Sequence, residues 1–248
     1  MQPAPPVDHA RRRLLTAVLP PALAVALLWI VFAFDRVYHL DLYRFGVLPR
    51  VAKGLVGIVV SPFVHDDLEH LFNNSAPIMV LGWLLVYFYP KATGRVVLAS
   101  WMLGGLWVWL TARDSYHIGA SGIIYGMAAF LFFSGLLRRR IALMAVSLIV
   151  VFLYGSMVWG VLPIQPRISW ESHLFGAVAG VVMAWFYRHV PPAHVPPPIV
   201  LEDDPEEDVE GATTEADPSS TGQADVPEAP AVRRGMGQLR DPFGNAGS

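Results

Sequence analysis

The sequence predicts an all-α polytopic membrane protein: a bundle of six membrane-spanning helices followed by a disordered C-terminal tail. Composition is the first observation. Of 248 residues, 54% are hydrophobic and 15% are charged, whereas charged residues make up about 25% of an ordinary globular protein. The second is that apolar stretches of membrane-spanning length recur along the chain. The third is that twelve of the twenty acidic residues lie after Leu201, so the apolar body and the acidic tail are separate regions.

The first helix is expected at Leu14–Phe34, which is 21 residues without a charge. At about 1.5 Å per residue this helix is long enough to cross a bilayer. Its length, the Pro20–Pro21 pair and the lack of a small-residue cleavage site before Asp35 favour a retained helix over a removed signal peptide.

A long loop, Asp35–Glu69, follows. Its apolar patch, Gly54–Val64, is too short to span and is interrupted by glycine and proline, so we expect an interfacial or half-inserted segment. Five further spans are expected at His70–Tyr89, Val96–Ala112, Ala120–Leu137, Ile141–Leu162 and Ser172–Tyr187.

The basic residues predict the orientation of these helices. If six helices alternate, one side carries Arg11–Arg13, Lys91, Arg95, Arg138–Arg140 and Arg188. The other side has six basic residues, four of which are spread through the long first loop. The positive-inside rule therefore predicts a multi-pass protein of the cell membrane with both termini in the cytoplasm. The helices that carry Ser121 and His173 then both begin at the outer face.

Residues 1–13, 14–188 and 189–248 are expected to be a cytoplasmic segment, the membrane domain and the tail. The tail opens with proline pairs and then has seven carboxylates within Glu202–Glu210, which predicts disorder. A solvated tail is the simpler interpretation, and docking of a partner is the alternative. The basic residues are scattered at segment ends, which argues against nucleic acid as a partner. Sixteen arginines against two lysines hint at a bacterial source.

Ser121 is the candidate nucleophile. It lies in His117–Gly126, a turn of small residues that leads into an apolar helix. A serine hydroxyl is a weak nucleophile at neutral pH, so it needs a base within hydrogen-bond reach and donors for the oxyanion.

His173 is the candidate base, since it opens the last helix. Gly176 and Gly180 share its helix face, and Gly122 with Gly126 forms a second pair of small residues on the serine helix. Such faces let helix backbones approach closely. The spacing is compatible with a serine–histidine pair, and plain helix packing with an anchoring histidine is the alternative.

Two further donors lie on the same outer side. His70 and Asn74 are four residues apart on one face of the second helix. With the backbone N–H groups of Gly119–Ser121 they could bind an oxyanion; alternatively, they cap the helix or bond one another. No cofactor and no metal are expected, because there is no cysteine and His65–His70 is one residue too long for a metalloprotease motif.

Three segments resemble the signatures of the rhomboid family of intramembrane serine proteases. They are Gly119–Gly122, His70–Asn74 with the preceding Pro62–His65, and His173–Gly180, and the resemblance covers Leu14–Arg188. One departure is that Val56-Gly57 occupies the place where many relatives carry a tryptophan–arginine pair. This departure bears on how the first loop anchors in lipid.

The resemblance implies a catalytic dyad of Ser121 and His173, with His70 and Asn74 stabilising the oxyanion and Tyr125 orienting the imidazole. It also implies a gate for substrate entry in the fifth helix, at Tyr154, Met157 and Trp159.

The implied activity is hydrolysis of single-pass membrane proteins near the outer face through an acyl-enzyme, so the partners are transmembrane substrates and the lipid bilayer. Activity should fall as His173 becomes protonated below about pH 6.5. Two alternatives remain: a rhomboid-like pseudoprotease that binds transmembrane helices without cutting them, and a small transporter. The transporter is disfavoured because the two halves of the chain show no repeat.

Overall fold

The computed structural model describes residues 7–165 and 168–193. In this part of the chain the fold is helical, and the extended structure consists of one isolated bridge between Val47 and His117. The long helices are α1 (Val7–Tyr38), α3 (Leu68–Phe88), α4 (Pro90–Thr111), α5 (Ser121–Arg138), α6 (Ile141–Tyr154) and α7 (Trp170–Phe186). The short ones are η1 (Leu42–Phe45), η2 (Ala52–Gly54), α2 (Leu55–Val60), η3 (Ser61–Phe63) and η4 (Gly155–Val161).

Among the described residues, five segments are long and apolar enough to cross a membrane: Arg11–Tyr38, Leu68–Phe88, Pro90–Thr111, Ser121–Arg138 and Ile141–Val161. The chain is therefore a multi-pass membrane protein. Of the six expected spans, the last falls on α7. Helix α7 is not one of these five segments, because its 17 residues are one fewer than the shortest of them has.

Two helices begin six or seven residues earlier than expected. α1 is helical from Val7, seven residues before Leu14, and continues through Pro20–Pro21. α4 begins at Pro90, six residues before Val96. A proline favours the first position of a helix, because its missing N–H would have no partner there and its φ angle is already helical.

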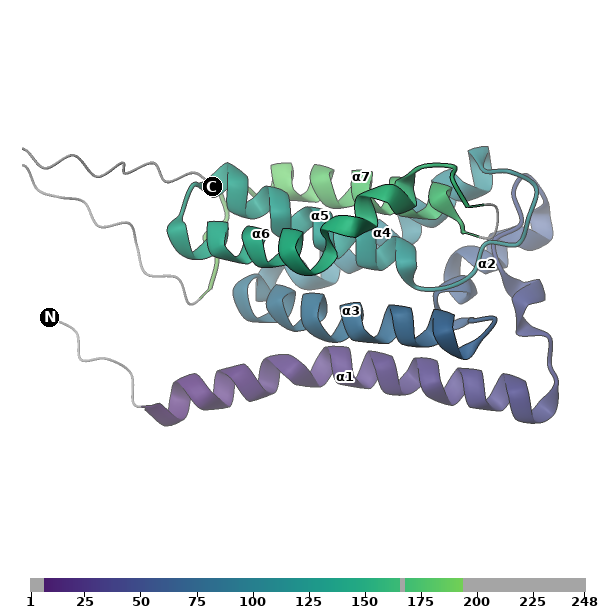
Figure 1. Ribbon diagram of the computed structural model, residues 1–248, viewed down its shortest axis with the longest axis horizontal. Helices are drawn as coiled ribbons and strands as arrows, with labels where there is room; N and C mark the ends of the chain where they lie inside the picture. The colour runs from purple at the N-terminus through teal and green to yellow at the C-terminus, as the bar shows by residue number, and fades with distance from the viewer. Residues whose placement is uncertain (1–6, 166–167, 194–248) are drawn as a thin grey trace, which may run out of the picture. The chain divides into compact units, whose positions relative to one another are not determined.

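Helix α5 is the centre of the bundle, because α3, α4, α6 and α7 all pack against it, while α1 packs along α3 (Figure 1). The contact between α5 and α7 is a contact of backbones. A Cβ atom on Gly176 would overlap the carbonyl oxygen of Gly122, and one on Gly180 would overlap that of Gly126. Glycine at these positions of α7 thus allows the two helices to lie close enough to bring Ser121 and His173 together.

The first loop packs against the bundle and supports the segment before Ser121. Its apolar patch is helical over Ala52–Phe63 and too short to span. Val47 exchanges two backbone hydrogen bonds with His117, of 3.0 and 2.9 Å. Gly57 belongs to the Val56-Gly57 pair of this loop, and a Cβ atom on it would overlap the backbone of Gly46 and Val47, so this close approach excludes a side chain.

Most of the expected tail lies outside the described residues, which end at Ala193. The part that is described continues from α7, and the N–H of Ala193 donates to the carbonyl oxygen of Phe88 at 2.8 Å. Residues 1–6 of the expected N-terminal segment also lie outside the described residues.

Candidate active site

Ser121 is the first residue of α5, and His173 lies in the first turn of α7. The Ser121 Oγ is 2.8 Å from the His173 Nε2. The His173 Nδ1 is 2.9 Å from the carbonyl oxygen of Gly160. A carbonyl oxygen only accepts, so the proton of the neutral ring belongs on Nδ1, and the lone pair of Nε2 faces the serine hydroxyl. His173 is 8% exposed, so the imidazole is buried in the helical bundle, and Ser121 is half-buried.

Tyr125 lies one turn after Ser121 and packs on the imidazole of His173. The two rings are stacked, with centroids 4.1 Å apart and 9° between their planes. The Tyr125 hydroxyl donates to the carbonyl oxygen of Met157 at 2.7 Å. Tyr125 is thus held by two contacts: its ring stacks on the imidazole of His173, and its hydroxyl binds a carbonyl oxygen of η4.

Gly160 completes the support of the imidazole, and it was not among the site residues predicted from the sequence. A Cβ atom at Gly160 would overlap the Tyr125 hydroxyl and lie 3.1 Å from the His173 Nδ1. Only glycine lets the backbone of η4 come this close to both rings.

His70 and Asn74 project from the first turns of α3 toward Gly119. A Cβ atom built on Gly119 would lie 2.5 Å from the His70 Nε2 and 3.6 Å from the Asn74 Nδ2. Asn74 is 3% exposed, and one of its amide hydrogens is donated to the His70 carbonyl oxygen at 3.0 Å. The structure therefore brings two side-chain donors to the backbone just before Ser121.

The backbone amides of this turn are not equivalent. The Gly119 N–H donates to the carbonyl oxygen of Ser61 at 2.9 Å, so this bond already uses that donor. Ser121 occupies the first helical position of α5, where an N–H has no partner within the helix. Its amide is thus better suited than that of Gly119 to bind an oxyanion. Gly119 contributes its φ of +95°, which a residue with a side chain rarely adopts.

A buried polar network beside the dyad was not expected from the sequence. His117, 2% exposed, is 2.6 Å from the Ser169 Oγ through its Nδ1. Ser169 in turn is 2.6 Å from the Ser172 Oγ. Glu171, 3% exposed, accepts the backbone N–H of Arg113 at 3.3 Å. Burial lowers the pKa of His117, which favours its neutral form. The network links the loop before Ser121 to the start of α7.

Two residues of the turn before α3 contact His70, one of the candidate oxyanion donors. Asp66 Oδ1 is 2.6 Å from the His70 Nδ1. The ring of His65 meets that of His70 edge to face, with centroids 4.9 Å apart. His65 is 2% exposed, and neither of its ring nitrogens has a hydrogen-bond partner among the described residues. Burial, and next the nearby His70, lower the pKa of His65 to about 4.

The expected gate residues lie where α6 gives way to η4. Tyr154 ends α6, and Met157 and Trp159 belong to η4. The Trp159 side chain is 64% exposed, and Met157 contacts the site through the carbonyl oxygen that Tyr125 binds.

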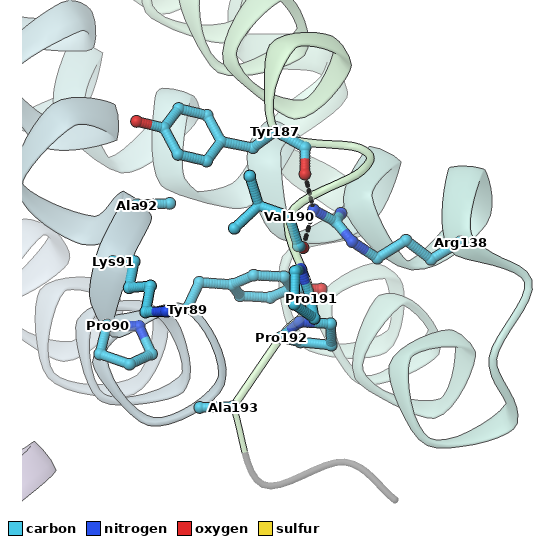
Figure 2. A pocket seen from close by; sticks show the side chains of 10 residues that line it. All are labelled: Tyr89, Pro90, Lys91, Ala92, Arg138, Tyr187, Val190, Pro191, Pro192 and Ala193. Atoms are coloured by element: carbon cyan, nitrogen blue, oxygen red, sulfur yellow. Dashed lines mark hydrogen bonds between the residues drawn. The ribbon is translucent and has the colours of Figure 1, made fainter. Parts of the chain in front are cut away.

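One cavity is at the opposite end of α5 from Ser121. Its volume is about 210 Å³, and Figure 2 shows Arg138 donating to the carbonyl oxygens of Tyr187 and Val190 at its wall. None of the expected site residues lines it. A smaller cavity of about 30 Å³ does border Gly119, Gly122 and Ser172. Within the described residues, no three His, Asp or Glu side chains are grouped so that they could hold a metal ion.

Comparison with known proteins matches this chain to one family. The sequence profile described as "Rhomboid domain" matches residues 52–190. An uncharacterized protein of Mycobacterium tuberculosis is 38% identical over 173 residues, which are 65% of this chain and 71% of that one. An uncharacterized protein of Mycobacterium leprae is 34% identical over 65% of this chain and 67% of its own length. The Bacillus subtilis protein named "Putative rhomboid protease YdcA" is 28% identical over 64% of this chain and 82% of its own. The mycobacterial relatives indicate a bacterial protein.

Proposed function

Because this chain belongs to the rhomboid family, we propose that it is a serine endopeptidase that hydrolyses single-pass membrane proteins near the outer face of the cell membrane. The observation that carries the proposal is the hydrogen-bonded chain from Ser121 through His173 to the carbonyl oxygen of Gly160, with distances of 2.8 and 2.9 Å. This is the arrangement that activates a serine: nucleophile, base and a group that orients the base.

The chain of bonds fits a dyad mechanism. In a Ser-His-Asp triad an aspartate fixes the imidazole tautomer, and here the Gly160 carbonyl oxygen would do so. His173 would take the proton of Ser121 as the hydroxyl attacks the substrate carbonyl, and would then give it to the leaving amine. An acyl-enzyme results, and a water molecule activated in the same way would release the second product.

The oxyanion would be held by the side chains of His70 and Asn74 and by the N–H of Ser121. Each of these groups lies at or next to the turn that ends in the nucleophile. Donors fixed in place before the reaction stabilise the developing charge, and removal of one typically costs about 10²–10³ in kcat.

We further infer that α7 is a sixth span and that both termini are cytoplasmic. An apolar helix of 17 residues is at the lower limit for crossing a bilayer. It runs in backbone contact with α5 from Gly176 to Gly180, and α5 is itself long enough to span. The positive-inside distribution of arginine and lysine supports this topology.

The test is reconstitution in liposomes with a single-pass reporter that carries small residues near its outer end. We expect the native protein to cleave the reporter, and Ser121→Ala and His173→Ala each to abolish cleavage while the proteins stay folded. Ser134→Ala is the matched control, since Ser134 is a buried serine on the same helix whose hydroxyl has no hydrogen-bond partner among the described residues. A native protein that binds the reporter without cutting it would contradict a protease and favour a pseudoprotease.

A further inference from the structure

Asp66 contacts the imidazole of His70, and the function proposed above gives this carboxylate no task. Its Oδ1 lies 2.6 Å from the His70 Nδ1, four residues further along the chain. Capping of α3 does not explain the contact, because Asp67 is the cap of this helix. Its carboxylate accepts a hydrogen bond of 2.7 Å from the backbone N–H of His70. The Asp66 carboxylate therefore contacts the ring of His70 without being the N-cap of α3.

The contact decides where the protons of His70 are. An ionised carboxylate only accepts hydrogen bonds, so the bond to Asp66 places a proton on Nδ1. A neutral imidazole has a single N–H, and its Nε2 would then present a lone pair. The Nε2 is the atom that lies against Gly119, just before Ser121. A lone pair there would repel an oxyanion, whereas an imidazolium, with a proton on each nitrogen, would donate to it.

The groups around His70 are compatible with a positive charge on it. Asp66, Asp67 and Glu69 supply negative charge from its own segment. His65 is neutral at ordinary pH, and His173 of α7 must be neutral to act as a base. The first turn of α5 has no charged residue. Burial raises the pKa of Asp66. The hydrogen bond with His70 and the charge of His70 lower it by more, so the pKa of Asp66 lies below its ordinary value.

We propose that Asp66 is a positioning residue which holds His70 as an imidazolium, so that His70 Nε2–H is a cationic donor to the oxyanion. This inference rests on the proposed protease function. The two histidines of the site then have opposite requirements: His173 must be without its second proton, and His70 must have it. Activity would therefore be confined to a window of pH with His173 setting the acid limit and His70 the alkaline limit.

The proton placement is tested first by nitrogen-15 NMR of histidine-labelled protein in micelles, with the His70 signals identified by their loss in His70→Gln. In the native protein at pH 7 we expect both nitrogens of His70 to be protonated. As the pH rises, His70 should lose its second proton at a lower pH in Asp66→Asn than in the native protein, whereas Asp67→Asn, which retains a helix cap and the Asp66–His70 contact, should have a much smaller effect. A neutral His70 at pH 7, or one indifferent to Asp66→Asn, would overturn the proposal.

Kinetics provide the second test. Native kcat should be bell-shaped with pH, and Asp66→Asn should move the alkaline limb down by about one pH unit and lower kcat at pH 8 by about tenfold, with KM changed less than about twofold. Asp66→Glu should restore much of the native profile. An Asp66→Asn profile equal to the native one would overturn the proposal. Native protein that cleaves nothing but shows an Asp66-dependent imidazolium would count against the protease function, while the placement of the protons would stand.

Discussion

Tyr125 and His173 lie face to face, with ring centroids 4.1 Å apart and an angle of 9° between their planes. The stack fixes the plane of the imidazole, while the carbonyl oxygen of Gly160 fixes its rotation within that plane. Since the Tyr125 hydroxyl is itself bound to Met157 at 2.7 Å, the orientation of the base depends on the position of η4.

The two contacts of Tyr125 are separable by mutation. Tyr125→Phe keeps the stack and loses the bond to Met157, and we expect kcat to fall less than about tenfold, because one neutral hydrogen bond contributes about 1 kcal/mol. Tyr125→Ala loses both, and kcat should fall about 10²-fold, since a misplaced catalytic group costs about that much. KM for the reporter and both kcat values would be measured in liposomes. Equal effects of the two variants would show that the stack has no role in orientation.

The backbone contact of α5 and α7 should tolerate no side chain at Gly176. In Gly176→Ala the new methyl group would meet the carbonyl oxygen of Gly122, and the helices must separate. Overpacking of this kind costs about 1–3 kcal/mol, and it would also move His173 away from Ser121. We expect a lower midpoint of thermal unfolding in detergent together with a large loss of cleavage.

Gly94→Ala is the control for this substitution. Gly94 is also inside a helix, α4, but a Cβ atom there has nothing within 4 Å. Alanine should then stabilise by about 0.5–1 kcal/mol, because it restricts the unfolded chain more than glycine does. A Gly176→Ala protein as stable as Gly94→Ala would contradict the close approach of α5 and α7.

His65 should make stability depend on pH. Its pKa is about 4 in the folded protein, against about 6.5 in an unfolded chain. Between these values the unfolded chain binds the additional proton, so stability is full above about pH 6.5, decreases as the pH falls toward 4, and decreases no further on this account below 4. The whole effect is at most about 3 kcal/mol.

His65→Leu tests this dependence. Neither ring nitrogen has a hydrogen-bond partner among the described residues, so an apolar side chain of similar size forfeits no described hydrogen bond. Thermal unfolding in detergent from pH 8 to pH 4 should show a flatter profile in His65→Leu than in native protein. His189→Gln, which removes an exposed histidine, is the control. A native slope retained in His65→Leu would mean that other groups cause the acid sensitivity.

The helices could be predicted from sequence because each one depends on its own composition. Runs of apolar residues between charged ends identified the spans to within a few residues at most ends. The pairing of Ser121 with His173 could also be suggested, since glycines at helical spacing indicate where two backbones can meet.

Contacts made across the fold by ordinary residues could not be predicted in this way. Gly160 looked like any other glycine in a short apolar segment, yet its carbonyl oxygen binds the His173 Nδ1. His117 and Glu171 are far apart in the sequence, and no spacing rule relates them. Asp66 is adjacent to the helix cap, Asp67, and nothing in the order of residues says which of two carboxylates contacts an imidazole.

The bond between His117 and Ser169 should couple the turn before the nucleophile to the start of α7. Its two atoms are 2.6 Å apart, and the His117 side chain is buried. Removal of one partner leaves a buried polar group unsatisfied, at a cost of about 1–3 kcal/mol. His117→Phe and Ser169→Ala should therefore each destabilise the protein, and the double variant should be less unstable than the sum, with a coupling of about 0.5–3 kcal/mol. Unfolding of the four proteins in detergent gives this coupling energy, and additive effects would mean that the bond does not link the two segments.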